Sequence, residues 1–396
     1  MTNRAARCCS VFSVIKQMNR FILFLSLASL ALMTACSGDK DNSNPGPGPD
    51  EGATNRKALL TYTVDDIILP GYAAFKVKLD TLTNRTNAFG AKPDPVKLTS
   101  LRQAWADAYV EWQKVELFDV GPANTQTLRF FFNIYPANAS GIEDNIKADN
   151  PNLDLPSAYP RQGFPALDYL LNGVAATDAA ILAKYTKPED GSVARIAYLK
   201  KIVTKMNLML GLVVSEWGSS RDKFVNCTGL DAGCSTSQLV NGYVLHYERY
   251  IRSGKIGIPS GAMTNGVVAP EKVEGFYKKD LSKLLAQTAQ QAFVDFFNGK
   301  SRKTGSEGLS LKTYLDGLKA KDSKTGELLT TAILNQLDVA AKKLQPLKAS
   351  FYDEIQTNNP AVVDVYTEMQ KVVRMLKVDM TTAMSITITY TDNDGD

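Results

Sequence analysis

Histidine is almost absent from this chain, because His246 is the single histidine among 396 residues. A zinc hydrolase uses three protein ligands, often histidines, and a Ser-His-Asp triad also requires one. One histidine leaves few ways to build either site. The sequence also contains no Gly-rich phosphate loop and no Gly-x-Ser-x-Gly turn. The sequence signals of P-loop NTPases and α/β-hydrolases are therefore missing.

Excess charge is missing as well. The formal net charge is +4, but four basic residues and no acidic residue precede Cys36. From Cys36 onward the basic and acidic side chains balance. A neutral body offers no basic surface to a phosphate backbone, so we expect no nucleic-acid partner.

Cysteine is scarce, and the five cysteines fall into two groups. Cys8 and Cys9 lie in the N-terminal signal described below, and Cys36 is the first residue after it. Cys227 and Cys234 enclose a Gly-containing loop, which in an exported protein predicts a disulfide. The alternative is a redox or metal pair, but the spacing is not Cys-x-x-Cys.

The N-terminus has the features of a secretory signal: a basic start, a short apolar run and small residues before Cys36. Met33-Thr34-Ala35-Cys36 resembles the bacterial lipobox, which implies cleavage before Cys36 and lipidation of that residue. Residues 1–35 are thus a predicted signal peptide, and 1–17 are an annotation extension if Met18 is the true start. An uncleaved signal anchor is the alternative.

Two segments, one after the predicted signal peptide and one at the C-terminus, are polar. Residues 36–55 are rich in Gly, Pro, Asp and Asn, which predicts a lipidated, disordered tether. Asp39 and Asp41 resemble surface-export signals of Gram-negative lipoproteins, so we expect a lipid anchor in the outer membrane, with the cell surface as one option. Residues 392–396 are predicted to be a frayed acidic tail rather than a calcium loop.

Between these ends, apolar residues recur mostly at helical spacing. The pattern predicts an all-α fold with two bundle-like halves packed together, 56–190 and 191–391. A short strand is expected at 385–390, where apolar and polar residues alternate. A likeness between the segments that begin at Gly163 and Gly308 suggests a duplication, and chance similarity remains the alternative.

The segment 161–173 is the centre of the predicted architecture. Gly163 can adopt a positive φ, and Pro165 then stands in the first helical turn, where proline is tolerated. Asp168 follows on a short helix with a buried apolar face. Its carboxylate either ligates a cation or accepts N–H groups from a neighbouring element.

Three further carboxylates could converge with Asp168, namely Glu111, Glu116 and Glu143. The alternative for each is a solvated or salt-bridged position. His246 is more readily explained as a structural residue than as a ligand. Lys255, in a segment with Gly257 and Pro259, fits either an anion site or a rigid connector.

Four segments taken together resemble the imelysin family of exported bacterial proteins. They are residues 105–116 with Gly121-Pro122, residues 133–136, the segment from Gly163, and residues 297–309. The resemblance implies two bundle-like helical domains with a site in the cleft between them. It also implies an activity, because the family is named for an insulin-cleaving metallopeptidase, whereas other members are associated with iron uptake.

The family's site motif, Gly-x-His-x-x-Glu, matches Gly163, Pro165 and Asp168 in this chain, and only the glycine is unchanged. Proline has no donor atom for a metal, so zinc hydrolysis at this motif is not expected. Asp168 remains the candidate metal ligand, and the candidate cofactor is a divalent or iron ion.

Three functions remain open. The preferred one is a non-catalytic lipoprotein that binds a metal or haem in iron-related acquisition, with an uptake system as a further partner. The second is a metallopeptidase of the same family that uses other ligands. The third is a structural or interaction lipoprotein without a small-molecule site.

Overall fold

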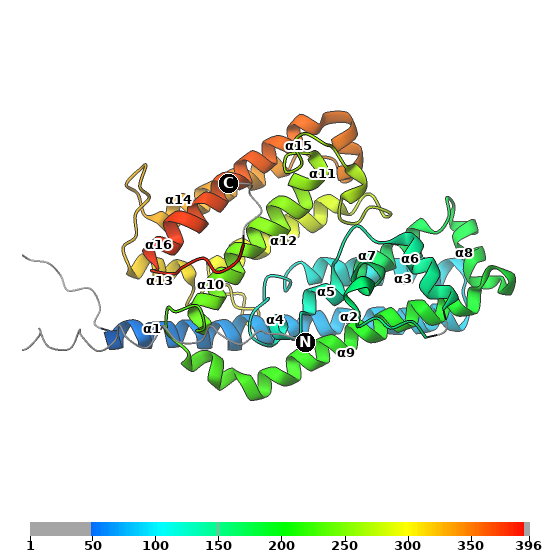
Figure 1. The fold of residues 1–396 in the computed structure, drawn as a ribbon, viewed down its shortest axis with the longest axis horizontal. Helices are drawn as coiled ribbons and strands as arrows, with labels where there is room; N and C mark the ends of the chain where they lie inside the picture. The colour runs from blue at the N-terminus through cyan, green and yellow to red at the C-terminus, as the bar shows by residue number, and fades with distance from the viewer. Residues whose placement is uncertain (1–48, 149, 392–396) are drawn as a thin grey trace, which may run out of the picture. The chain divides into compact units, whose positions relative to one another are not determined.

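The computed structural model describes residues 49–148 and 150–391, whose regular structure is helical (Figure 1). Within these residues the only β pairings are two isolated bridges, Lys300 with Glu307 and Lys321 with Leu328. The predicted all-α class is confirmed. The predicted signal peptide, Cys36, residues 36–48 of the tether and the tail 392–396 lie outside the described residues.

The first group of helices surrounds α2 (Leu69–Ala91), which packs against α3 (Pro95–Trp112) and α9 (Ser192–Asn226). Asp94 caps α3, as its carboxylate accepts the backbone N–H of Lys97 at 2.8 Å. The other helices of this group are α1 (Pro49–Tyr62), α4 (Pro122–Thr125), α5 (Leu128–Phe132), α6 (Ala139–Lys147), α7 (Gly163–Asp168) and α8 (Asp178–Thr186).

The second group, yellow-green to red in Figure 1, begins with α10 (Ser235–Leu245). This helix continues through a π-helical segment, η5 (His246–Gly257), into α11 (Ile258–Ser260). Helices α12 (Ser282–Phe297) and α15 (Phe351–Arg374) pack against η5, and α14 (Leu329–Leu344) packs against both of them. The shorter elements are α13 (Leu311–Gly317), η7 (Met375–Met380) and α16 (Thr381–Ala383).

Helix α9 contacts α1, α2 and α4 to α8, so it belongs with the first group. These contacts favour a boundary after α9, whereas the sequence suggested one between residues 190 and 191. The division into two halves stays a prediction, because all described residues lie in one compact unit, Pro47–Asp396. The proposed duplication also stays a prediction.

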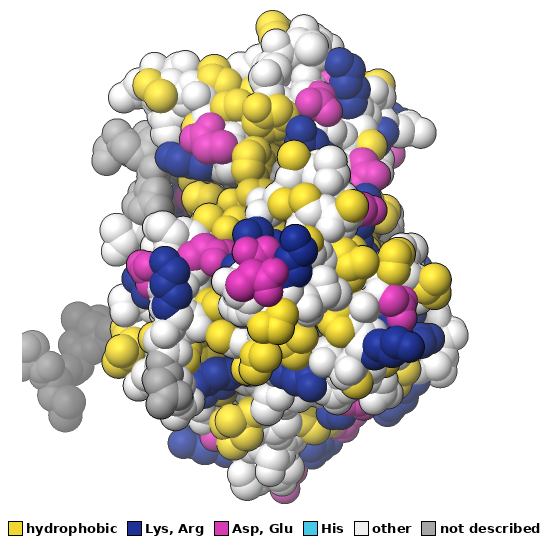
Figure 2. Space-filling model, turned by 90° about the vertical axis from the view of Figure 1, so that its right-hand side faces the viewer, with side chains coloured by type: hydrophobic (Ala, Val, Ile, Leu, Met, Phe, Trp, Pro, Cys, Tyr) yellow, Lys and Arg dark blue, Asp and Glu magenta, His cyan; other side chains and the backbone are white. Residues whose placement is uncertain are grey.

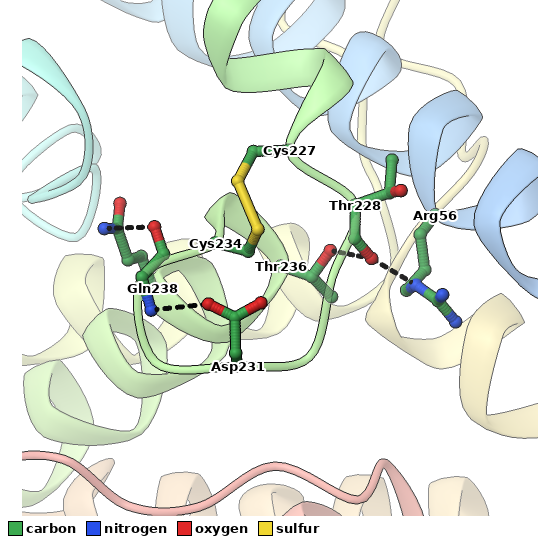
Figure 3. Close-up of a disulfide and its surroundings, with 8 residues drawn as sticks. Arg56, Cys227, Thr228, Asp231, Cys234, Thr236 and Gln238 are labelled. Atoms are coloured by element: carbon green, nitrogen blue, oxygen red, sulfur yellow. Dashed lines mark hydrogen bonds between the residues drawn. A yellow bond between two sulfur atoms is a disulfide. The ribbon is translucent and has the colours of Figure 1, made fainter.

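A disulfide joins Cys227, just after α9, to Cys234, just before α10 (Figure 3). Within the enclosed loop, the carbonyl of Thr228 accepts hydrogen bonds from Arg56 on α1, at 2.5 Å, and from Thr236, at 3.4 Å. The Arg56 guanidinium also reaches the hydroxyl of Tyr314 on α13, at 3.3 Å. The loop is therefore fixed to both helix groups at the point where the chain passes from one to the other.

A π-helical segment, η1 (Thr63–Ile68), connects α1 to α2, and Pro70 is the second residue of α2. Proline donates no hydrogen bond, and its ring crowds the carbonyl four residues earlier, here that of Asp66. This carbonyl instead accepts the backbone N–H of Arg302, at 2.8 Å. The proline thus leaves a carbonyl of the first group available for a hydrogen bond from the second group.

Two local expectations are wrong. Residues 385–390 form no strand: the side chain of Asn241 bonds the carbonyl of Thr387, at 3.0 Å, and the N–H of Thr389, at 2.8 Å. A single amide side chain thus takes the place of a partner strand. Residues 49–55, placed in the tether by composition, form the first turns of α1, with Pro49 at a position where helices accept proline.

No single described helix has the length and apolar character needed to cross a membrane; one bent pair, Pro156–Gly173 with Asp178–Thr186, passes that test on length and composition. On the face shown in Figure 2, basic and acidic side chains lie beside one another rather than in patches of one sign.

Candidate functional site

Gly163 fixes the start of α7. Its φ is +73°, and a Cβ atom there would lie 2.3 Å from the carbonyl oxygen of Phe132. Only glycine allows this approach of α7 to the end of α5. The predicted special conformation at Gly163 is therefore present, and it places Asp168 at the buried end of α7.

Asp168 is 2% exposed, and its carboxylate accepts three hydrogen bonds. The donors are the backbone N–H groups of Tyr277, at 2.9 Å, and Lys278, at 2.9 Å, together with the amide of Asn172, at 3.0 Å. Burial raises the pKa of Asp168 to about 7, although the three N–H donors oppose this shift. The carboxylate thus holds the segment 271–278 of the second group against α7, and we call this arrangement the Asp168 clamp.

A small pocket of about 150 Å³ lies beside the clamp. Its walls are largely aromatic and proline side chains, with two carboxylates. They comprise Tyr135, Pro136, Ala137, Pro165, Asp168, Glu271, Val273, Gly275, Phe276 and Tyr277. Pro165 lines the pocket at the position of the family's histidine and contributes only carbon atoms.

The 271–278 segment also contributes to a buried polar network centred on Glu274, which is 2% exposed. Glu274 pairs with the ammonium group of Lys255, itself 2% exposed. Its other oxygen accepts from the amides of Gln113, at 2.9 Å, and Asn133, at 2.8 Å. The network therefore joins residues of both helix groups through charge-assisted hydrogen bonds.

Glu116 extends this network. One of its oxygens accepts from Asn133, at 2.9 Å, and lies 3.2 Å from Nε of Arg129. The Arg129 guanidinium in turn stacks 3.4 Å above the ring centroid of Tyr250. The second oxygen of Glu116 has no hydrogen-bond partner.

The carboxylates expected to converge with Asp168 do not form one site. Glu111 pairs with Lys114, at 2.7 Å, and with Arg302. Glu143 makes two hydrogen bonds to Arg195, at 2.7 and 2.8 Å, and the pKa of Glu143 is lowered because these bonds outweigh its partial burial. Glu116 belongs to the buried network. Each carboxylate thus has its own cationic partner, as the salt-bridge alternative proposed.

The residues around Asp168 do not fit a resident metal ion. All three partners of its carboxylate are N–H donors, and Pro165 offers no ligand atom. Among residues 49–148 and 150–391, no three His, Cys, Asp or Glu side chains are grouped so that they could hold an ion. The predicted metal-ligand role of Asp168 is therefore not supported by the donor set.

His246 is buried in η5, and neither ring nitrogen has a hydrogen-bond partner. Burial and the neighbouring cations Lys255 and Arg129 lower the pKa of His246 well below its usual range. The ring is therefore neutral at pH 7.

Sequence reasoning missed Glu274 and Asn133, and it treated Lys255 as an anion site or a connector. Lys255 and Glu274 are 19 positions apart and share no helix, so no spacing rule connects them. The sequence drew attention to Lys255 only through its place beside Gly257 and Pro259.

Fold and site together define an all-helical protein in which two helix groups meet across buried hydrogen bonds to Glu274 and the Asp168 clamp. The sequence model of the imelysin family matches residues 68–374. This chain belongs to the imelysin family.

The solved structures that resemble this fold include an imelysin-like protein from Psychrobacter arcticum 273-4, with a TM-score of 0.65 and 17% identity over 85% of this chain and 98% of that one. A precursor of the iron-regulated protein A type from Parabacteroides distasonis ATCC 8503 gives a TM-score of 0.62, with 17% identity over 84% and 97% of the two chains. Among curated proteins, iron-regulated protein A of Synechococcus elongatus is 26% identical over 118 residues. That match spans 30% of this chain and about a third (32%) of the relative.

Proposed function

We propose that this chain is an exported, lipid-anchored binding protein that acts in iron- or metal-related acquisition and does not cleave peptides. The observation that carries the proposal is the Asp168 clamp. The motif position that would activate water in a peptidase is here occupied by a carboxylate with three N–H partners and by the carbon atoms of Pro165. The names of the iron-regulated relatives support the link to iron.

The test uses protein purified from its own host. Elemental analysis is expected to find iron or another metal near one atom per chain, and insulin B chain incubated with the protein and added zinc is expected to stay intact. Metal-dependent cleavage that is lost in Asp168→Ala would contradict the proposal. A protein without metal and without peptidase activity would favour the structural or interaction role instead.

The anchor is a separate part of the proposal, and it rests on the lipobox-like residues that end at Cys36. Mass spectrometry of the mature N-terminus is expected to find a diacylglyceryl modification on Cys36. In the host, Cys36→Ser is expected to leave the membrane fraction. If the variant stays in the membrane fraction, another part of the chain holds it there.

A further inference from the structure

A second and larger pocket, of about 600 Å³, opens at the contact between the helix groups. It shares no lining residue with the pocket beside Asp168. The first group contributes Ile67, Lys114 and Phe118, and the second contributes Phe296, Lys300 and Arg302. Its volume lies in the range of small-molecule sites. We call it the hairpin pocket, because the turn 299–308 forms one wall.

The inner wall of the hairpin pocket is apolar. Ile67, Phe118 and Phe296 are 3%, 3% and 6% exposed, and the rings of Phe118 and Phe296 lie with their centroids 5.9 Å apart. Each of these side chains lines the pocket with a small exposed area of hydrocarbon. An aromatic ligand gains contact area and ring interactions there.

The rim carries more cations than carboxylates. Lys114 and Arg302 share the single carboxylate of Glu111, and Lys300 faces Asp295 at 3.5 Å. One positive charge is therefore left without a carboxylate of its own. The side chains of Lys114, Arg302 and Lys300 are 36%, 27% and 46% exposed, so they can still contact a ligand.

The turn that carries Arg302 is held in a fixed shape. Gly299, with φ at +72°, bonds Gly308 across the turn at 3.0 Å, and its carbonyl also accepts the hydroxyl of Tyr62, at 3.1 Å. The backbone N–H of Arg302 donates to the Asp66 carbonyl, which receives no helical hydrogen bond from Pro70 because proline has no N–H. The first helix group thus positions the cation of the second, as a preorganised site requires.

We propose that the hairpin pocket binds an anionic aromatic chelate of ferric iron, of the catecholate or phenolate class. This inference rests on the proposed function and names its ligand. A chelator supplies the donor atoms for its own metal, so the protein needs no ligand cluster, and the described residues contain none. The negative charge of the chelate meets Lys114, Lys300 and Arg302, and its rings lie against the apolar inner wall. Lysine and arginine also bind the faces of electron-rich rings.

The experiment measures binding by equilibrium dialysis of the full chain in a non-ionic detergent. The probes are ferric tris-catecholate, ferric citrate, catechol alone and ferrous ion alone. We expect ferric tris-catecholate to bind most tightly, ferric citrate about tenfold more weakly, and the separate components not to bind. Affinity for the catecholate complex should fall as salt rises, because exposed cations are screened.

The variants are Lys300→Gln and Arg302→Gln, each expected to weaken binding of the catecholate complex about fivefold to tenfold. Lys303→Gln is the matched control: it removes the same charge from the same turn, but Lys303 pairs with Asp66 and does not line the pocket. Its affinity should stay within about twofold of the wild type. Since Lys300 is 46% exposed, its variant is expected to fold, which thermal unfolding followed by circular dichroism checks.

The outcomes separate this inference from the proposed function. If the wild type binds the catecholate complex and both pocket variants bind it equally well, the hairpin pocket is not the binding site and the proposed function stands. Equal binding of ferric citrate, or binding of the bare ion, overturns the aromatic-chelate class. If no iron species binds and the host protein carries no metal, both proposals fall.

Discussion

The two sides of the contact between the helix groups use their charges in different ways. On the buried side, the side chains of Lys255 and Glu274 form an ion pair, and each is 2% exposed. The amide groups of two further residues donate hydrogen bonds to the Glu274 carboxylate. At the hairpin pocket, the lining cations Lys114 and Arg302 share the carboxylate of Glu111, and the rim is partly open to water. The buried side is complete without a ligand and joins the groups, whereas the open side has positive charge left for a ligand.

The largest effect is expected when a buried charge loses its partner. Glu274→Gln leaves the Lys255 ammonium without a counter-charge and should lower the free energy of unfolding by about 3–5 kcal/mol. Urea unfolding measures the loss. The double variant Lys255→Met/Glu274→Leu should recover part of it, because the unpaired ammonium of Lys255 is then absent. A loss below about 1 kcal/mol in the single variant would show that the pair does not hold the buried side together.

The next effect tests the close approach that positions the Asp168 clamp. Gly163→Ala places a Cβ 2.3 Å from the Phe132 carbonyl oxygen and should destabilise by about 3 kcal/mol. Gly191→Ala is the control, because Gly191 has a similar φ of +75° and nothing within 4 Å of the added atom. It should cost only about 1 kcal/mol, for the left-handed backbone alone. Equal losses in the two variants would rule out steric contact as the reason for glycine at 163.

The disulfide comes third. It closes a short loop between α9 and α10, and replacing both cysteines by serine should lower the free energy of unfolding by about 2.5 kcal/mol through the entropy of the unfolded chain. Urea unfolding of the wild type with and without reductant offers a second measurement. Equal unfolding midpoints with and without reductant would show that the loop is held by Arg56 and Thr236 alone.

The smallest effect concerns pH. The pKa of Asp168 is raised to about 7 by burial, so between about pH 4 and 7 the folded chain binds more protons than the unfolded one. Its contribution to stability is therefore present at low pH and is lost as pH rises through 7. Relative to Asp168→Asn, the wild type should lose about 2 kcal/mol between pH 5 and 7. The same pH dependence in both proteins would contradict this titration.

Helical periodicity, the glycine at 163 and the cysteine pair could all be predicted from the sequence, because each depends on neighbouring residues. The arrangement of charges could not. Glu111 and Glu116 lie close in the chain, but Glu111, in the last turn of α3, pairs with Arg302, whereas Glu116, in the turn after α3, accepts from Asn133. Asn241 likewise took the place of a strand partner for residues 385–390. These partners are distant in sequence, and no local pattern names them.

The most direct test of the contrast between the two sides is the iron content of variants purified from the host. Asp168→Asn should retain iron at the wild-type level, because Asp168 joins the helix groups and does not ligate the metal. A Lys300→Gln/Arg302→Gln variant should lose it while remaining folded. Loss of iron from folded Asp168→Asn, with full iron in the pocket variant, would contradict the account.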